Sequence, residues 1–596
     1  MAEMGRPPID MPADSGDGYD SRTRAHASST AARIRKQYSH EFPISTNPDK
    51  RSARSDDGYV ASHTHAVSSR LLRRSSTEQG GRPARGDGNR RTIDADYHHP
   101  LEDVLATRPM QRLLGWISRC RASGMTMIEE IIASYANPRA SFWHRLKYWP
   151  FHLFIDRMRG TVSAETFRKR VAEHTSTIRG LVITARSLAE FGLTVPQRFS
   201  VPLFAVWNFT NLCNLKCKHC YQDSDHKRLV DELTLDEKFD LVDQMGQQYL
   251  PMVAFAGGEP TISKDLLPVM RRCEQYGIHT SVATNGTMIT PKLAAQLAEA
   301  GVRYVEISLD SVHPERHDAF RGQPGMWERA VHGMRNVVEQ EGLRLGVAMC
   351  VHQDNYDEVE DMLRFATDIG AGCLAHFNFI PVGRGLEMAE ADLTPRQRER
   401  MLQTFNRWMQ SGKIAILSTA PQFGRVCIAH APTEGLQACS HAGSGSGEKA
   451  RVVAKYLGAC GAGRTYVCIE PNGDITPCVY LPHRLLGSIR KRRFADICRD
   501  NEFWEILCDR SRRTHHCEVC EFKNYCGGCR ARADAYHGHL NAGDPGCIYN
   551  EKHWDKLVAQ SAATNPTPAA QTSDQHTLPI ASLPARERPR SPAEAR

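Results

Sequence analysis

The sequence predicts an α/β fold with a parallel sheet, on the basis of three features of the chain. Between about residues 202 and 382, short apolar runs alternate with segments whose apolar residues recur at helical spacing, as in βαβ units. Three cysteines directly follow the first of these runs, and ten of the 19 cysteines lie beyond residue 455. We therefore expect a parallel α/β core followed by a cysteine-rich domain.

Two outer segments are not expected to fold. Residues 1–95 are rich in Arg, Ser, Asp and Gly, show little apolar periodicity, and predict a disordered basic arm. Residues 558–596 are rich in Pro, Ala, Thr and Ser and predict a disordered tail. The net charge of +8 includes basic runs such as residues 70–76. Such a run is typical of a solvated linker or of a nucleic-acid contact, and no nucleic-acid partner is expected.

The chain shows no signal for export or for a membrane span. Its first 30 residues contain no apolar h-region, and no run of 18 apolar residues occurs. Nineteen cysteines in 596 residues without a signal peptide favour metal ligation over a disulfide framework. These features predict a cytoplasmic protein that binds metal in a reducing compartment.

Residues 96–200 predict a helical extension in which one stretch mixes aromatic with basic residues. This stretch, residues 141–160, reads SFWHRLKYWPFHLFIDRMRG. Its composition suits a helix packed on the next domain, and it also suits a helix on a membrane surface, which would be a peripheral membrane contact. Pro150 is expected to break the helix, which favours packing.

Residues 201–390 form the predicted core, with six strands alternating with helices. The strands are expected at residues 203–209, 252–256, 281–284, 304–310, 345–351 and 376–380. The helices between them are expected at residues 234–247, 266–276, 291–300, 327–341 and 356–369. Another helix begins after Thr394, where Pro395 and Gln397 complete the start signal. This helix is the first element of residues 391–455, which are predicted to form a helical linker with a flexible Gly/Ser insert.

The run CNLKCKHCY, after the first strand, spaces Cys213, Cys217 and Cys220 as C-x3-C-x2-C. It supplies three thiolates to a metal centre, whereas the usual ferredoxin cluster takes four. A [4Fe-4S] cluster held by three cysteines leaves one iron open to another ligand. The spacing therefore predicts chemistry at the metal rather than electron storage alone.

Other candidate ligand-binding residues follow the later strands. In parallel α/β folds, ligands bind at the carboxyl ends of the strands. A glycine pair there lets the backbone approach a ligand closely, and a carboxylate can accept from an ammonium group. The candidates at these positions are Gly257, Gly258, Glu259, Pro260, Asn285, Ser308, Asp310 and Pro381.

The cysteine run with Tyr221 directly after it, together with GGEP and ISLDS in this order, resembles the radical S-adenosylmethionine (radical SAM) superfamily. The resemblance implies a partial (β/α)6 barrel and a [4Fe-4S] cluster whose open iron chelates the amino and carboxylate groups of SAM. It further implies that residues 257–260 hold the SAM amino group, that Ser308 and Asp310 contact the ribose, and that Asn285 lies near the pocket.

In such a protein, reductive cleavage of SAM gives a 5′-deoxyadenosyl radical that takes a hydrogen atom from a C–H bond. The cofactors perform this step, so no acid–base residue is required and no catalytic side chain is assigned. An electron donor such as flavodoxin or ferredoxin is expected as a partner. Arg384, just beyond the sixth strand, is interpreted as a clamp for a carboxylate or as a surface arginine.

Residues 456–557 resemble the SPASM domain, a module with auxiliary iron–sulfur clusters. Eight thiolates satisfy two [4Fe-4S] clusters. By resemblance, one set is Cys460, Cys468, Cys478 and Cys529, and the other is Cys517, Cys520, Cys526 and Cys547. Only Gly527 and Gly528 separate Cys526 from Cys529, whereas many members have three residues there. The assignment of these two cysteines to one cluster or the other therefore stays open.

Zinc is the alternative metal for the dense cysteine run. Zinc ribbons separate their CxxC pairs by about 15–20 residues, whereas five residues separate the pairs here, which favours iron–sulfur clusters. The remaining cysteines are interpreted as buried or incidental thiols: Cys120, Cys273, Cys350, Cys373, Cys427, Cys439, Cys498 and Cys508. Four histidines are interpreted as polar surface residues: His515, His516, His537 and His539.

The sequence thus predicts a radical SAM/SPASM oxidoreductase. The CGGC variant, seen in members linked to porphyrin and quinone cofactors, favours tetrapyrrole or redox-cofactor biosynthesis with a small-molecule substrate. Maturation of a ribosomally made peptide is the main alternative. A lipid-modifying enzyme and a non-catalytic iron–sulfur carrier are further alternatives. The auxiliary clusters are expected either to accept electrons or to bind substrate.

Overall fold

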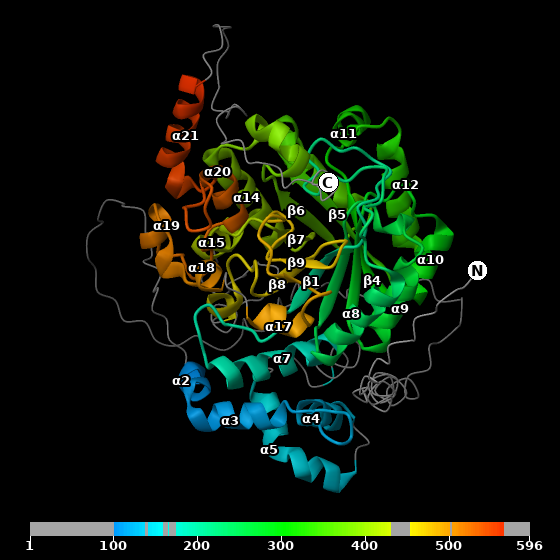
Figure 1. The fold of residues 1–596 in the computed structure, drawn as a ribbon, viewed down its shortest axis with the longest axis vertical. Coiled ribbons are helices and arrows are strands. Elements are labelled where there is room, and N and C mark those ends of the chain that lie inside the picture. Colours follow the sequence, from blue (N-terminus) through cyan, green and yellow to red (C-terminus); the bar gives the residue numbers. More distant parts are fainter. Residues whose placement is uncertain are drawn as a thin grey trace, which may run out of the picture.

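The computed structural model describes residues 100–137, 141–158, 165, 175–430, 453–500 and 504–564 (Figure 1). The predicted basic arm, the Gly/Ser insert and Cys439 lie outside these residues. The last helix, α21 (Glu551–Thr564), continues into the segment that was predicted to be a disordered tail.

A group of helices precedes the sheet and lies below it in Figure 1. These are α2 (Pro100–Ala106), α3 (Arg108–Ile117), α4 (Met127–Ala136), α5 (Phe142–Met158) and α7 (Thr175–Phe191). The last four of these helices share a small apolar core, which includes Ile131, Tyr148 and Val182. Arg179 of α7 fastens this group to the sheet, because its guanidinium donates to the backbone carbonyls of Gly246, Leu250 and Tyr276.

The prediction that Pro150 breaks its helix is wrong, because α5 runs through it. The N–H that proline lacks would face the carbonyl of Leu146, on an exposed part of the helix where water can serve as partner. One side of α5 packs on α4 through the buried Tyr148, as the packing interpretation expected. Its other side exposes large apolar side chains, among them Trp143 (75%) and Trp149 (50%).

One ten-stranded sheet, in the order β10-β9-β8-β1-β2-β3-β4-β5-β6-β7, forms the centre of the molecule. Strands β1 to β7 are all parallel, as predicted for the core. They are β1 (Phe204–Asn208), β2 (Met252–Ala256), β3 (His279–Thr284), β4 (Val302–Ser308), β5 (Arg344–Val351), β6 (Cys373–Asn378) and β7 (Ala415–Ser418). The four-residue β7 was not predicted, since so short an apolar run carries no clear period.

Helices connect these strands and pack on the outer face of the sheet. They are α8 (Leu235–Gln247), α9 (Leu266–Gln275), α10 (Pro291–Glu299), α11 (Pro314–Arg321), α12 (Met326–Glu339), α13 (Val359–Asp368), α14 (Pro395–Gln410) and α15 (Gln422–Ala429). Short 3₁₀ turns lie among them: η1 (Pro260–Ile262), η2 (Gln353–Glu358) and η3 (Gly383–Ala391). The helix start expected at Thr394 is a capping box, and a second capping box forms at Thr234, where another predicted helix begins.

The alternation of burial along β4 shows which face of the sheet meets the helices. Val305 and Ile307 are fully buried in the main core beneath the helices. Tyr304, Glu306 and Ser308 point to the opposite face and are only half-buried. This second face therefore lines the interior of the open barrel, below the carboxyl ends of the strands.

The cysteine-rich C-terminal region continues the same sheet. Strand β8 (Tyr466–Ile469) pairs in parallel with β1, and Cys468 lies opposite Val206. Strands β9 (Asp474–Thr476) and β10 (Gly487–Ser488) extend it in antiparallel fashion. The helices and turns that follow are α17 (Phe494–Arg499), α18 (Trp504–Cys508), η4 (Arg510–Arg512), α19 (His516–Val519), α20 (Arg530–His537) and η5 (Ile548–Asn550). In the described parts of the chain, no helix is long and apolar enough to cross a membrane.

Candidate functional site

The loop that follows β1 brings the three predicted cluster cysteines together. Cys213, Cys217 and Cys220 belong to one apolar group with Leu215 and Met326. Cys213 and Cys217 are buried and Cys220 is half-buried, and all three are free thiols. We call residues 209–225 the cysteine loop.

Glycines from three other loops press against the backbone of the cysteine loop. A Cβ at Gly258 would lie 2.3 Å from the carbonyl oxygen of Leu212, and one at Gly383 would lie 2.5 Å from that of Cys220. The same atom at Gly322 would lie 2.7 Å from a carbonyl of the loop. The glycine pair thus packs closely against the cysteine loop, and its expected approach to a ligand stays a prediction.

Glu259 ties the end of β2 to the end of β3. Its carboxylate accepts hydrogen bonds from the N–H and hydroxyl of Thr261, the hydroxyl of Thr284 and the N–H of Asn285. Burial raises the pKa of Glu259, while these donors favour its ionised form. Asn285 in turn donates to Asn214 of the cysteine loop at 2.8 Å. The predicted residues Glu259 and Asn285 thus lie directly beside this loop.

Asp310 and Arg321 form a buried ion pair behind the cysteine loop. Arg321 Nη2 lies 2.6 Å from Asp310 Oδ2, and its Nη1 donates to the sulfur of Cys217 at 3.7 Å. The other Asp310 oxygen accepts from the N–H of Cys350 at 3.0 Å. Burial alone would raise the pKa of Asp310, but Arg321 and nearby histidines hold it at about 2. Arg321 was missed because no local motif marks it.

Arg384 connects the middle of the cysteine loop to its end. Its guanidinium donates to the carbonyls of Cys217 and Ser224, at 2.9 and 2.8 Å, and pairs with Asp223 at 2.8 Å. Its backbone N–H donates to the carbonyl of Cys220. The interpretation of Arg384 as a surface arginine is therefore wrong, because the side chain is only 14% exposed and holds the loop. Its interpretation as a clamp for a SAM or substrate carboxylate stays a prediction.

Three of the four cysteines predicted for the first auxiliary set meet in one apolar group. Cys460, Cys478 and Cys529 lie there together with Tyr466 and Tyr480. The fourth, Cys468, is fully buried on β8 with its sulfur 3.4 Å from a carboxylate oxygen of Glu470.

Cys508 packs against the same apolar group, although it was interpreted as an incidental thiol. It comes from α18, about 30 residues after Cys478 and nine before the dense run. Nothing in its sequence spacing pointed to this position.

The second auxiliary set also gathers in one place. Cys520 and Cys526 pack with Phe522 and Tyr525. Burial raises the pKa of Cys526 well above its ordinary value, and the neighbouring Cys547 and Cys517 raise it further. The four thiols predicted for this set therefore lie within electrostatic reach of one another.

The donor set fits iron–sulfur clusters. Among the residues that the structure describes, no three or more His, Cys, Asp or Glu side chains are arranged to hold a single metal ion. A [4Fe-4S] cluster needs no such convergence, because each thiolate binds a different iron. Buried thiols such as Cys478, whose pKa burial raises to about 12, become ligands only when a metal takes the place of the proton.

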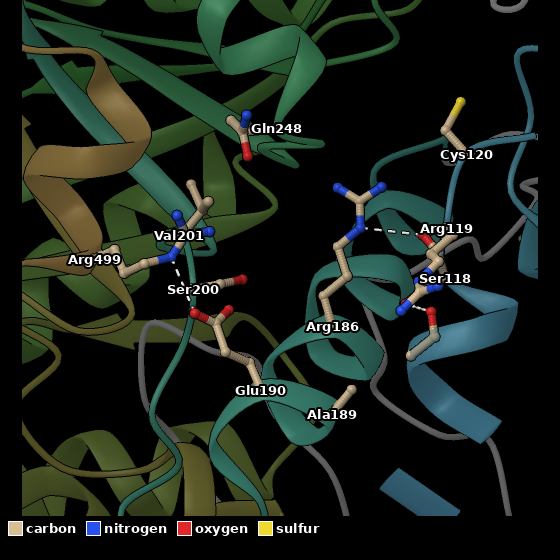
Figure 2. Close-up of a pocket in the computed structure, with 11 residues that line it drawn as sticks. Ser118, Arg119, Cys120, Arg186, Ala189, Glu190, Ser200, Val201, Gln248 and Arg499 are labelled. Atoms are coloured by element: carbon tan, nitrogen blue, oxygen red, sulfur yellow. Dashed lines mark hydrogen bonds and ion pairs between the residues drawn. The ribbon is translucent and has the colours of Figure 1, made fainter. Parts of the chain in front are cut away.

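A pocket of about 600 Å³ lies away from all of these residues (Figure 2). It opens between α3, α7 and the segments that lead into β1 and β2, at the amino ends of the strands. Arg186 points into it and donates to the carbonyl of Ser118 at 3.1 Å, while Arg499 pairs with Glu190 at 3.0 Å. None of the predicted site residues lines this pocket.

Comparison with known proteins agrees with this arrangement. A profile of the radical SAM superfamily matches residues 207–366, and a profile of SPASM, an iron–sulfur cluster-binding domain, matches residues 460–526. The AdoMet-dependent heme synthase of Methanosarcina barkeri is 32% identical over 351 residues, which cover 59% of this chain and 97% of that protein. Mycofactocin maturase MftC of Mycolicibacterium smegmatis is 28% identical over 376 residues, covering 62% and 88%.

The crystal structure of Streptococcus suis SuiB bound to S-adenosylmethionine shares the fold. It superposes with a TM-score of 0.50 at 16% identity and covers 71% of this chain and 93% of that one. The chain belongs to the radical SAM superfamily and carries a SPASM domain. Its cofactors are a [4Fe-4S] cluster with S-adenosylmethionine in the core and auxiliary iron–sulfur clusters in the SPASM domain. The match to an iron–sulfur domain favours these clusters over the zinc alternative.

Proposed function

We propose that this protein is an oxidoreductase that acts on a tetrapyrrole in heme or redox-cofactor biosynthesis. The observation that carries the proposal is the match to the heme synthase of Methanosarcina barkeri, which extends over 97% of that protein. The CGGC run at Cys526–Cys529 supports the same class of substrate.

Cys213, Cys217 and Cys220 would hold the core cluster, and the loop ends at residues 257–260, Asn285, Ser308 and Asp310 would surround SAM. When bound, these cofactors supply a 5′-deoxyadenosyl radical that removes a hydrogen atom from the substrate. The chain's own side chains fix the three thiols. Arg321 bonds to the sulfur of Cys217, and Arg384 bonds to the carbonyl of the same residue.

The substrate would face the half-buried side of β4 inside the barrel. Tyr304 donates to the carboxylate of Glu306 at 3.1 Å on this face, below Ser308. Burial raises the pKa of Glu306 to about 7, so this group exchanges a proton near neutral pH. A carboxyl of this kind can donate a hydrogen bond to a substrate carboxylate or accept one from an N–H.

The eight C-terminal cysteines would hold two auxiliary [4Fe-4S] clusters that accept an electron from the oxidised substrate. A chain of hydrogen bonds supports this link between the two regions. Tyr221 donates to Asn208 at 2.9 Å, and Asn208 donates to Glu470 at 3.0 Å, beside Cys468. The pairing of β1 with β8 places these residues side by side.

The test uses the full chain, reconstituted with iron and sulfide without oxygen, and supplied with SAM and a reduced flavodoxin or ferredoxin. We expect an iron porphyrin with propionate side chains to be converted to a product of lower mass, with 5′-deoxyadenosine formed in proportion. A porphyrin that stays unchanged while a precursor peptide is modified would overturn the tetrapyrrole substrate. That outcome would favour the peptide alternative, in line with the similarity to mycofactocin maturase.

A further inference from the structure

Four arginines are buried in the C-terminal domain without an acidic partner among the residues that the structure describes. Arg464, Arg510, Arg513 and Arg530 are each at most 7% exposed. Within the described chain, their hydrogen-bond acceptors are backbone carbonyls and asparagine side chains, and none of the four pairs with a carboxylate. Isolated buried charges are costly, so each of these guanidinium groups needs a counter-charge.

Two of them, Arg513 and Arg530, keep an N–H group without a protein acceptor. Arg513 donates to the carbonyls of Ile506 and Leu507, both at 2.6 Å, but no described residue accepts from its Nε. Arg530 donates to the carbonyl of Leu540 at 2.6 Å, and its Nη2 likewise has no acceptor among the residues described. We call Arg513 and Arg530 the arginine pair.

The arginine pair lies beside both groups of cysteines. Arg530 directly follows Cys529 of the first group, and the space at Gly528 borders both its guanidinium and the sulfur of Cys517 from the second group. Arg513 donates to the carbonyls of Ile506 and Leu507, which pack in the apolar group that contains Cys460, Cys478 and Cys529. A guanidinium group keeps its proton at neutral pH, so both side chains are cations.

The glycines of the CGGC run leave room for the arginine pair. A methyl group at Gly528 would lie 2.4 Å from Nη2 of Arg530, 3.1 Å from Cβ of Asp544 and 3.5 Å from the sulfur of Cys517. Gly528 also has a φ of +68°, which favours glycine. The guanidinium and the thiol therefore border the same small space.

Other buried arginines of the molecule do have acidic partners. Arg532, whose backbone N–H donates to the sulfur of Cys529 at 3.5 Å, pairs with Asp392, and Arg398 of α14 pairs with the same carboxylate at 2.6 Å. Within the described residues, no carboxylate pairs in this way with Arg513 or Arg530. A cluster held by four thiolates carries net negative charge and can serve as their counter-charge.

We propose that the two guanidinium groups of the arginine pair supply positive charge beside both auxiliary clusters and so make both clusters easier to reduce. Reduction adds one negative charge to a cluster, and nearby buried cations stabilise that charge, which raises the reduction potential. The proposal rests on the proposed function, in which these clusters accept an electron.

The electrons balance as follows. The substrate loses one hydrogen atom to the deoxyadenosyl radical, which leaves as 5′-deoxyadenosine beside methionine. The remaining substrate radical loses one electron to an auxiliary cluster and one proton to solvent, which completes a two-electron oxidation of the substrate. A one-electron carrier protein then removes the electron from the cluster. A higher potential at the auxiliary clusters favours this second transfer.

The test is an EPR-monitored redox titration of the reconstituted full chain. The background variant C213A/C217A/C220A removes the core cluster, so that the signals come from the auxiliary clusters. Each of four substitutions is introduced separately into this background: R513M, R530M, R513K and R530K. The matched control is R179M, because Arg179 is also buried and bound to three carbonyls but lies away from both cysteine groups.

We expect the Arg→Met variants to shift at least one auxiliary midpoint to more negative potential, and the Arg→Lys variants to shift it less. R179M should leave both midpoints unchanged. Unchanged midpoints in R513M and R530M, with iron content retained, would overturn the proposal. If the Met variants lose iron, retention of iron by the Lys variants supports the charge role, and loss from both overturns it.

This titration needs no substrate, so it separates the two proposals. Shifted midpoints without porphyrin conversion would leave the arginine pair supported and the tetrapyrrole substrate wrong. Porphyrin conversion with unshifted midpoints would support the tetrapyrrole substrate and overturn the proposed role of the arginine pair.

Discussion

The cysteine loop and the C-terminal cysteine groups balance their buried charges in different ways. Beside the loop, Arg321 is neutralised by Asp310 before any cofactor binds. Beside the C-terminal cysteines, Arg513 and Arg530 have only neutral hydrogen-bond partners within the described part of the chain. In the first site, the buried positive charge of Arg321 is therefore balanced by a protein group. The second leaves positive charge that the clusters themselves can neutralise, so cluster binding and folding should be coupled more strongly there.

The largest expected effect comes from removing a thiol of the loop. C217A should abolish the core cluster and lower SAM cleavage more than about 100-fold, beyond the 10- to 100-fold typical of changes around a metal site. The auxiliary iron should remain, because the two regions bind their clusters independently. Iron analysis and 5′-deoxyadenosine assays measure both quantities.

C273A is the matched control for C217A, since Cys273 is a buried thiol of the main core. It should retain all of the iron. Loss of the auxiliary iron from C217A would show that the two regions do not load separately.

The next largest effect concerns the buried ion pair. R321M leaves Asp310 buried without its partner and should destabilise the cluster-free chain by about 3–5 kcal/mol. The double variant D310N/R321M should recover part of that loss, because no charge then stays unpaired. Denaturant unfolding measures these free energies, and a double variant as unstable as R321M would contradict the ion-pair explanation.

The same pair gives a pH dependence with a definite sign. The folded-state pKa of Asp310 is held at about 2, below the ordinary value of about 3.9 in an unfolded chain. Its stabilisation is therefore present above about pH 4 and is lost as the pH falls towards 2. The cluster-free D310N variant should lose less stability over this range than the unchanged chain, as measured by denaturant unfolding at each pH.

A smaller effect would show which cysteines bind the first auxiliary cluster. Because Cys508 packs with Cys460, Cys478 and Cys529, we expect C508A to lower the iron content of the reconstituted chain. C498A is the control, since Cys498 is a buried thiol in the main core. Full iron in C508A, with loss in C468A, would instead restore the set that the family resemblance implies.

The smallest effect is expected where the two regions meet at the surface. Arg490 pairs with Glu237 of α8 at 2.7 Å, and both side chains are more than one third exposed, at 37% and 34%. R490A should therefore cost less than about 1 kcal/mol in the free energy of unfolding. A cost as large as that of R321M would mean that surface pairs, too, hold the two regions together.

The core strands were predictable because each is a short apolar run bounded by turn residues. The predicted strand at residues 252–256 coincides with β2, and the capping box at Thr234 marks the start of α8. The family could be recognised because three thiols within eight residues must meet in space whatever the fold. Local spacing was enough in these cases.

Long-range partners were not predictable in the same way. The positions of Arg321, Arg384 and Cys508 depend on segments that lie far apart in the chain. The join of β8 to β1 depends on backbone hydrogen bonds across more than 250 residues. Such contacts leave no periodic signal in the sequence. Local signals can also mislead: the helix α5 continues through Pro150, because the carbonyl left without a hydrogen bond faces water.

The sequence by itself determined the cysteine spacing, the β/α alternation and hence the chemistry that the core can support, because these depend on neighbours within a few residues. Only the tertiary structure decided which charges surround each group of thiols. Charge balance in a buried site depends on which distant segments pack there. It is set at the loop by Asp310, and at the C-terminal cysteines by Arg513 and Arg530, which pair with no carboxylate among the described residues.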